Sequence, residues 1–157
     1  MSTPPLALHL AQQLLAELSA PYQVPPQPTE SPTKFVSPQD IADFMAPRMD
    51  QLEQEELWVI LVNTRNTLIG TEMLYRGTLN SAHVRTAEVF RLAVRTNAAA
   101  IVVVHNHPSG DPTPSEPDIN VTRLLVLAAK TLDIQLLDHI IVAPPGRWYS
   151  LKEHGHV

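Results

Sequence analysis

Residues 99–118 read AAIVVVHNHPSGDPTPSEPD, and this stretch contains a strand, a loop and the start of a helix. The apolar run 99–104 is typical of a strand buried on both faces of a sheet. It leads directly into His105, and alternation along a strand points His105 and His107 to the same side. The segment 106–114 holds one glycine and three prolines, which predicts a stiff loop.

Asp118 follows His107 by eleven residues and lies in the first turn of a helix predicted over 115–132. Because a proline-rich loop is stiff, it can bring that helix start back over the end of the strand. Two imidazoles and one carboxylate then converge. Two histidines with a carboxylate are a standard ligand set for catalytic zinc, with the fourth position left to water. The sequence therefore predicts a zinc site made of His105, His107 and Asp118.

The same residues also have structural interpretations. A histidine at a strand end is usually structural or solvated. Ser115 and Asp118 form Ser-x-x-Asp, the pattern of a helix capping box, and without the histidines this would explain Asp118 equally well. Asp111 is typical of a turn, and Asn106 is interpreted as a cap of the loop.

The rest of the chain predicts one mixed α/β (α+β) domain. Ser37-Pro38-Gln39-Asp40 combines an N-cap serine, a proline at the first helical position and an acid, which marks a helix start. Pro47 is expected to limit that helix. Apolar runs and helical periodicity predict strands over 57–62 and 67–75, a helix over 84–95, and, beyond the central segment, strands over 134–142 and 147–151. Such an order indicates a mixed sheet flanked by helices.

The N-terminal part differs in composition. Prolines cluster over 21–38 and predict an extended linker, while leucines at helical spacing over 6–18 fit a short amphipathic helix or a frayed tail equally well. We expect an N-terminal extension over 1–33, the domain over 34–151, and a frayed C-terminal tail over 152–157.

Composition and net charge exclude several classes of function. The 157 residues are 44% hydrophobic and 17% charged, as in a globular domain, and they include no cysteine, which excludes disulfides, thiolate catalysis and Cys-rich zinc sites. The net charge of -5 argues against nucleic-acid binding through phosphate neutralisation. Neither a secretory signal nor an apolar run long enough for a membrane span is evident, so we expect a cytoplasmic protein without membrane contact.

The central segment carries a family resemblance. The pattern H-x-H-x7-S-x-x-D, with a glutamate upstream of a buried strand, resembles the JAMM motif of the JAB/MPN metalloprotease superfamily. The fuller string HNHPSGDPTPS at 105–115 resembles the RadC-like branch, as do RGTL at 76–79, AEVF at 87–90 and LDHIIV at 137–142. The resemblance covers residues 37–151. It implies a JAB/MPN-like fold and Zn²⁺ as the cofactor.

By position, the resemblance implies the zinc ligands His105, His107 and Asp118, and an oxyanion-stabilising Ser115. In family members an acid stands two residues before the large apolar residue that starts the strand. Leu57 holds that place here, so Glu55 matches the general base. Glu53 and Glu56 have the alternative interpretation of solvated connecting residues, and Glu72 is a more distant candidate.

The resemblance implies hydrolysis of a peptide or isopeptide bond in a peptide or protein substrate. The alternative is a DNA repair or replication accessory factor that acts without hydrolysis. An inactive scaffold ranks last, because this chain keeps every metal ligand. Two departures stand out: a Pro-rich segment replaces the N-terminal helix-hairpin-helix-type region that RadC-like proteins often carry, and Pro117 precedes Asp118 where an acid is more usual. A homodimer is compatible with the sequence.

Overall fold

The structure, a computed structural model, describes residues 32–77 and 84–157. The helix or tail expected over 6–18 and most of the expected linker lie outside these residues. The described chain begins beside the sheet, where the Leu68 N–H donates to Thr33 O at 2.8 Å and the Phe35 N–H to Asn66 O at 3.0 Å. The boundary at residue 34 therefore stays a prediction, with Thr33 already bonded to the domain.

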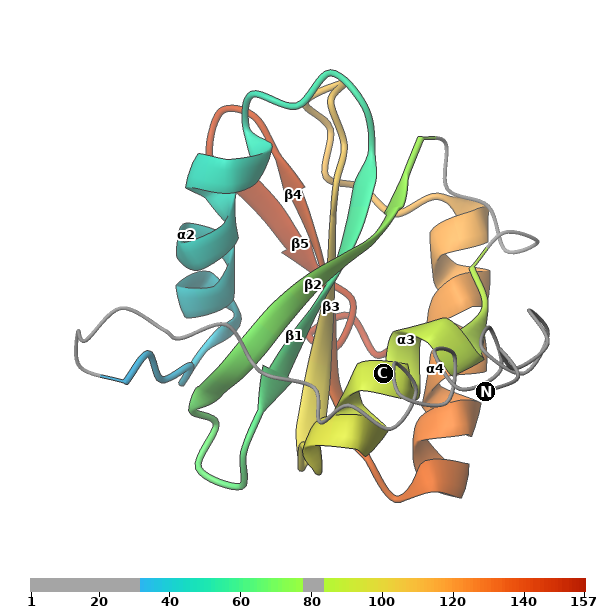
Figure 1. Ribbon diagram of the computed structural model, residues 1–157. Helices are drawn as coiled ribbons and strands as arrows, with labels where there is room; N and C mark the ends of the chain where they lie inside the picture. Colours follow the sequence, from blue (N-terminus) through green and yellow to red (C-terminus); the bar gives the residue numbers. More distant parts are fainter. Residues whose placement is uncertain (1–31, 78–83) are drawn as a thin grey trace, which may run out of the picture.

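A five-stranded sheet forms the centre of the molecule, in the order β2-β1-β3-β4-β5 (Figure 1). Its strands are β1 (Glu56–Val62), β2 (Leu68–Arg76), β3 (Ala100–Asn106), β4 (Gln135–Ala143) and β5 (Arg147–Ser150). β1 pairs antiparallel with both β2 and β3, whereas β3 and β4 are parallel. The parallel pair needs a crossover connection, which the proline-rich loop and a long helix provide.

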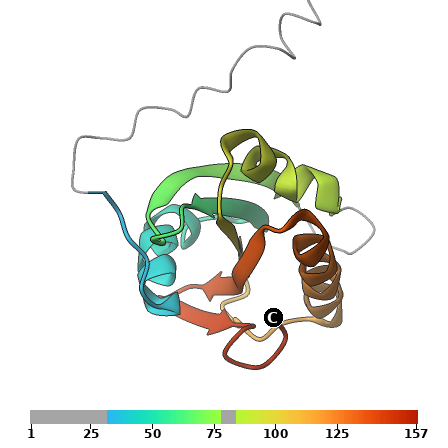
Figure 2. The same ribbon diagram turned by 90° about the horizontal axis from the view of Figure 1, so that it is seen from below.

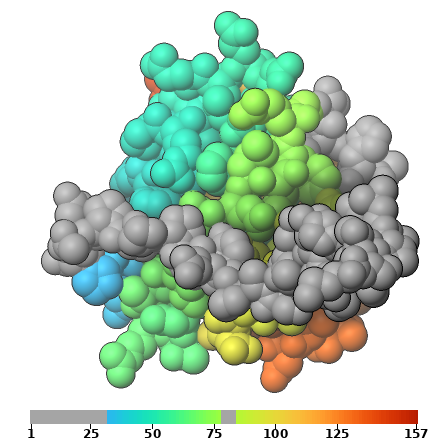
Figure 3. Space-filling view, viewed as in Figure 1, coloured from blue at the N-terminus to red at the C-terminus, as the bar shows by residue number. Residues whose placement is uncertain are grey.

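Helices cover both faces of this sheet. Helix α2 (Pro38–Met49) packs on one face, and α3 (Thr86–Thr96) and α4 (Glu116–Leu132) lie on the other, as the two perpendicular views show (Figures 1 and 2). The edge strand β2 crosses the front of the molecule in the space-filling view (Figure 3). None of the helices in the described part of the chain has the length and apolar character needed to cross a membrane.

The apolar side chains form two separate cores, one on each face of the sheet, because successive residues of a strand point to opposite faces. Leu57, Val59 and Leu61 belong to the core under α3 and α4, whereas Ile60 and Val62 belong to the core under α2. All seven residues of β3 are buried, because this central strand is covered on both faces. The position of β3 explains the apolar run before His105, and it fixes the face toward which His105 points.

The predicted mixed α/β fold is confirmed, with two corrections. Ser37 caps α2 in a capping box with Asp40, as predicted, but the helix continues past Pro47 to Met49. Proline removes only its own N–H, and the Asp50 N–H still closes the last turn onto Ala46 O at 2.9 Å. The tail expected to fray instead forms turns, in which the His156 N–H donates to Leu151 O at 2.8 Å.

Candidate metal centre

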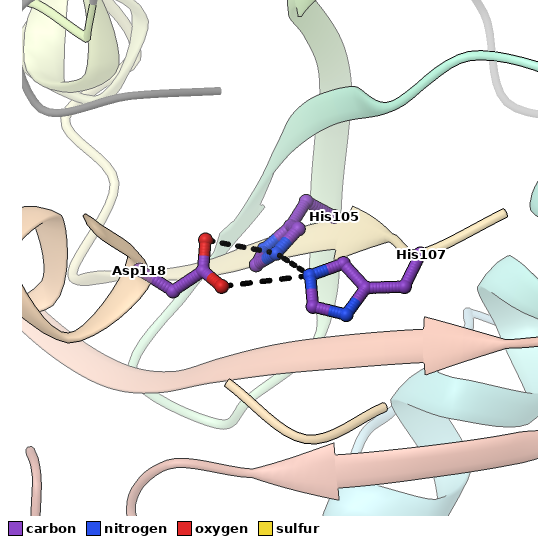
Figure 4. A group of neighbouring side chains, drawn as sticks. All are labelled: His105, His107 and Asp118. Atoms are coloured by element: carbon purple, nitrogen blue, oxygen red, sulfur yellow. Dashed lines mark hydrogen bonds and ion pairs between the residues drawn. The ribbon is translucent and has the colours of Figure 1, made fainter. Parts of the chain in front are cut away.

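Three side chains converge where β3 ends and α4 begins (Figure 4). His105 lies on β3, His107 follows its last residue, and Asp118 lies in the first turn of α4. The two histidine Nε2 atoms are 2.9 Å apart; Asp118 Oδ1 lies 3.2 Å from His105 Nε2, and Asp118 Oδ2 lies 3.5 Å from His107 Nε2. One ligand atom from each residue lies within 4.8 Å of the others. The structure thus brings together the three residues that the sequence predicts as ligands.

The loop between His107 and α4 is held in place by hydrogen bonds between its own side chains and backbone. Asp111 O accepts a hydrogen bond from His107 Nδ1 at 2.8 Å, and the Asp111 side chain accepts one from the Thr113 N–H at 3.0 Å, so its predicted turn role is confirmed. Gly110 has a φ of +86°, and a Cβ there would lie 3.1 Å from Pro144 O. A side chain at this position would combine a strained backbone with a close contact.

Ser115 and Asp118 form a capping box as well as contributing to the cluster. Asp118 Oδ2 accepts hydrogen bonds from the Ser115 N–H at 2.7 Å and from Ser115 Oγ at 2.6 Å, while Ser115 Oγ accepts one from the Asp118 N–H at 3.3 Å. The two interpretations of Ser-x-x-Asp are therefore both realised. The cap engages Oδ2 and leaves Oδ1 directed at His105.

A histidine on the neighbouring strand lies behind His105. His139 Nε2 is 2.8 Å from His105 Nδ1, and His139 Nδ1 is 2.6 Å from Thr122 Oγ1 on α4. Thr122 Oγ1 also donates to Asp118 O at 2.7 Å. No role for these two residues was predicted from the sequence. A signal was present, because Asp138-His139 is a polar pair within an otherwise buried strand, and buried polar groups need specific partners.

The ionisation states of the cluster favour an anionic carboxylate. Burial opposes ionisation of Asp118, but the contacts of its carboxylate with His105 and His107 outweigh it and hold the pKa of Asp118 well below its usual range. Burial also disfavours a charged His107, yet its contacts with Asp118 and Asp111 and the negative charge of Glu55 raise the pKa of His107. Complete burial holds the pKa of His139 well below that of a free histidine.

Glu55 is the residue directly before β1. Leu57 pairs with His105 and shares the face of the sheet under α3 and α4, so Glu55, two residues earlier, follows the same alternation. The negative charge of Glu55 is the smallest of the named influences that raise the pKa of His107. The Glu55 carbonyl accepts a hydrogen bond from the Gly77 N–H at 2.8 Å.

Asn106 holds the chain on both sides of Glu55, which corrects the interpretation of Asn106 as a loop cap. Its Oδ1 accepts a hydrogen bond from the Glu56 N–H at 2.7 Å, and its Nδ2 donates to Gln54 O at 3.0 Å. These bonds span about fifty residues of sequence, so no local pattern indicated them. They hold the backbone on either side of Glu55 against Asn106, which stands between His105 and His107 in the sequence.

The other three glutamates are placed differently. Glu56 accepts hydrogen bonds from Arg76 Nε and Trp58 Nε1, both at 2.8 Å, on the face toward α2. Glu72 contacts Arg91 of α3 at 3.2 Å, and Glu53 is exposed.

The donor set fits a metal ion. His107 Nδ1 contacts a carbonyl, which can only accept, so His107 carries a proton on Nδ1, and in the neutral ring Nε2 carries the lone pair and is directed toward the cluster. Two imidazole nitrogens and a carboxylate suit zinc and other first-row divalent metals. The three residues could therefore hold one metal ion.

Comparison with known proteins agrees with this geometry. Residues 35–156 match the family model of the RadC-like JAB domain. A UPF0758 protein of Chloroflexus aurantiacus is 52% identical over 119 residues, which cover 76% of this chain and 52% of that protein. UPF0758 proteins of Clostridium beijerinckii and Staphylococcus aureus are 43% and 47% identical over 122 and 123 residues. This chain spans about half the length of these curated relatives. The chain belongs to the RadC-like JAB domain family.

Proposed function

We propose that this domain is a zinc-dependent hydrolase of the JAMM type that cleaves a peptide or isopeptide bond. The observation that carries the proposal is the convergence of His105 Nε2, His107 Nε2 and the Asp118 carboxylate on one point. Three protein ligands leave a fourth position for water or substrate, as in catalytic zinc sites. When bound there, zinc would polarise the scissile carbonyl and lower the pKa of a coordinated water.

We assign the role of general base to Glu55. Its carboxylate acts on His107 electrostatically, and Asn106 fixes the backbone on either side of it. In the proposed reaction Glu55 takes the proton of the attacking water and delivers it to the leaving amine. Glu56 lies on the opposite face of the sheet from His105, bonded to Arg76 and Trp58, which supports Glu55 over Glu56 as the base.

Ser115 is proposed to assist in two ways. Its hydroxyl orients Asp118 through the cap, and after rotation it can donate a hydrogen bond to an oxyanion formed beside the metal. In the present arrangement the hydroxyl proton is directed at Asp118 Oδ2, so the second role requires a change of rotamer.

Metal analysis tests the first half of the proposal. The purified chain should hold about one zinc, because the cluster supplies one set of three ligands. His107→Ala and Asp118→Ala should each lose the metal. Full zinc occupancy after His105→Ala and His107→Ala are combined would refute the site.

A cleavage screen tests the second half. Proteome-derived peptides and proteins would be incubated with the wild type, with Glu55→Gln and with Glu53→Gln. Glu55→Gln should keep its zinc and lose about 10²- to 10⁴-fold in rate, because the amide cannot accept a proton. Glu53→Gln, at an exposed position two residues away, is the matched control and should cleave as the wild type does. Equal cleavage by the Glu55→Gln variant would reject Glu55 as the base.

A further inference from the structure

We propose that Thr122 and His139 are positioning residues that fix the tautomer of His105, so that its Nε2 presents a lone pair to the metal. This inference rests on the proposed metal site. It adds that two residues behind the ligands are needed to orient His105. Its basis is a chain of hydrogen bonds that begins at Asp118 O on α4, passes through Thr122 and His139, and ends at His105 Nδ1.

The donor and acceptor of each hydrogen bond follow from the first bond, between Thr122 and Asp118. A carbonyl oxygen has no proton to give, so the Thr122 hydroxyl donates to Asp118 O. That hydroxyl has a single proton, so toward His139 Nδ1 it can only accept. His139 therefore carries a proton on Nδ1, and in the neutral ring its Nε2 is an acceptor.

The consequence passes to the metal ligand. Because His139 Nε2 accepts, His105 must donate from Nδ1, and in the neutral His105 ring Nε2 is then unprotonated. That nitrogen lies 2.9 Å from His107 Nε2 and 3.2 Å from Asp118 Oδ1. In the neutral rings that a metal needs, both histidines therefore carry the proton on Nδ1, His107 because of the Asp111 carbonyl and His105 because of this chain of hydrogen bonds.

The hydrogen-bond chain is anchored at the backbone carbonyl of Asp118, and its far end, His105 Nε2, lies 3.2 Å from the carboxylate of the same residue. Thr122 is fully buried and His139 nearly so, which protects the bonds from competition with water. A threonine hydroxyl in a helix commonly bonds the carbonyl four residues earlier, but that habit does not account for a buried histidine 2.6 Å away on another element.

Loss of the Thr122 hydroxyl should reverse the direction of the hydrogen bond between His139 and His105. In Thr122→Val the side chain keeps its shape, but His139 Nδ1–H loses its acceptor. The ring can then carry its proton on Nε2 and donate to His105 Nδ1. His105 would in turn protonate Nε2, which is the atom needed by the metal. Thr122→Ser keeps the hydroxyl and is the matched control.

Zinc affinity, measured by competition with a chromophoric chelator, is the first readout. Removal of outer groups that orient a histidine ligand typically costs on the order of 10- to 100-fold in metal affinity. We expect that loss in Thr122→Val and near wild-type affinity in Thr122→Ser. Equal affinity in the wild type and Thr122→Val, or equal losses in both variants, would overturn the proposal. Thermal melts of the metal-free proteins control for folding.

The second readout needs neither activity nor metal. Long-range ¹H–¹⁵N spectra of ¹⁵N-histidine-labelled wild type distinguish the two neutral tautomers of each ring. His139 should appear with its proton on Nδ1, and an Nε2–H tautomer there would overturn the proposal even if Thr122→Val fails to fold. If the wild type shows the expected tautomer but binds no zinc, the proposed hydrolase fails while the positioning chain stands.

Discussion

Asn106 and Glu56 are joined by a buried hydrogen bond of 2.7 Å, from the Glu56 backbone N–H to Asn106 Oδ1. The bond ties the start of β1 to the end of β3. In the sequence, Asn106 stands between the two histidines of the candidate metal centre. Since the Asn106 amide also donates to Gln54 O, one side chain sets the backbone on both sides of Glu55. The backbone that carries the proposed base is therefore bonded directly to the strand end that carries the candidate metal ligands.

Asn106→Ala should destabilise the fold and misplace Glu55. The Glu56 N–H would be left buried without its acceptor, which typically costs about 1–3 kcal/mol of unfolding free energy. Urea unfolding measures this loss, and zinc content should stay near the wild-type value because no ligand is removed. In a Glu55→Gln background Asn106→Ala should cause no further loss of cleavage. A further loss in that background would show that Asn106 acts other than through Glu55.

Ser115→Ala should weaken the start of α4 and the orientation of Asp118. Losing a serine N-cap costs about 1 kcal/mol of stability, and the Asp118 carboxylate would keep only the backbone N–H of its capping box. We expect a smaller loss of cleavage than in Glu55→Gln, because a bound metal also stabilises the oxyanion. Ser115→Thr preserves the cap and serves as the control. A loss in Ser115→Ala equal to that in Glu55→Gln would make the hydroxyl indispensable to the reaction.

Duplex DNA should bind the isolated chain weakly. The net charge is -5, and Arg85, the N-cap of α3, and Arg91 within α3 are each in an ion pair, with Glu88 and with Glu72, at 3.2 Å. Fluorescence anisotropy with a labelled duplex should give a Kd no tighter than roughly 10⁻⁴–10⁻⁶ M, the non-specific range at physiological salt. Tight binding with a steep salt dependence would instead favour the repair-factor function, with Arg85, Arg91 and Arg95 as the first residues to replace.

A truncated chain starting at residue 32 should fold and bind zinc as the full chain does. The domain was predicted to start at residue 34, but Thr33 O accepts from the Leu68 N–H at the edge of β2, so the test should retain Thr33. Cooperative thermal unfolding and zinc content are the measurements. An insoluble or molten product would mean that residues 1–31 contribute to the core.

The parts of the site that could be predicted from the sequence are those encoded locally. His105, His107 and Asp118 follow from strand alternation, a proline-rich loop and a helix start within fourteen residues. Asn106 and His139 could not be assigned, because their partners lie far away in the chain: Asn106 bonds the segment before β1, and His139 bonds both β3 and α4. Such contacts depend on which strands become neighbours, and periodicity does not determine that order.

In the fold, too, features encoded locally in the sequence were predicted correctly, and those that depend on other contacts were not. Each predicted strand and helix in the described part of the chain was found, because burial imposes a period of two or of about three and a half residues on the sequence. The error at Pro47 concerned a helix end, where the final turn depends on a single hydrogen bond, from the Asp50 N–H to Ala46 O. The turns of the tail are held partly by its backbone, from the His156 N–H to Leu151 O, and partly by the Asp138 and Ser150 side chains, and such contacts leave no local pattern in side-chain polarity.

Asp138 provides a prediction on pH dependence that is independent of the metal. Its carboxylate is buried and accepts hydrogen bonds from Ser150 Oγ at 2.6 Å and from the His139 and Lys152 N–H groups at 2.7 and 3.1 Å. Burial is the largest influence and raises the pKa of Asp138, while these hydrogen bonds oppose it without cancelling it. The folded pKa therefore lies above the unfolded value of about 3.9.

The sign of the effect follows from linkage. A raised folded pKa means that the protonated carboxyl stabilises the fold: this contribution is complete below about pH 3.9 and is lost as pH rises through the folded pKa. Urea unfolding of the metal-free wild type and of Asp138→Asn, from about pH 4 to pH 7, isolates the contribution, since other titrating groups cancel in the difference. The wild type should lose stability relative to Asp138→Asn as pH rises. A difference that runs the other way would mean that the three hydrogen bonds outweigh burial and that the fold favours the ionised carboxylate.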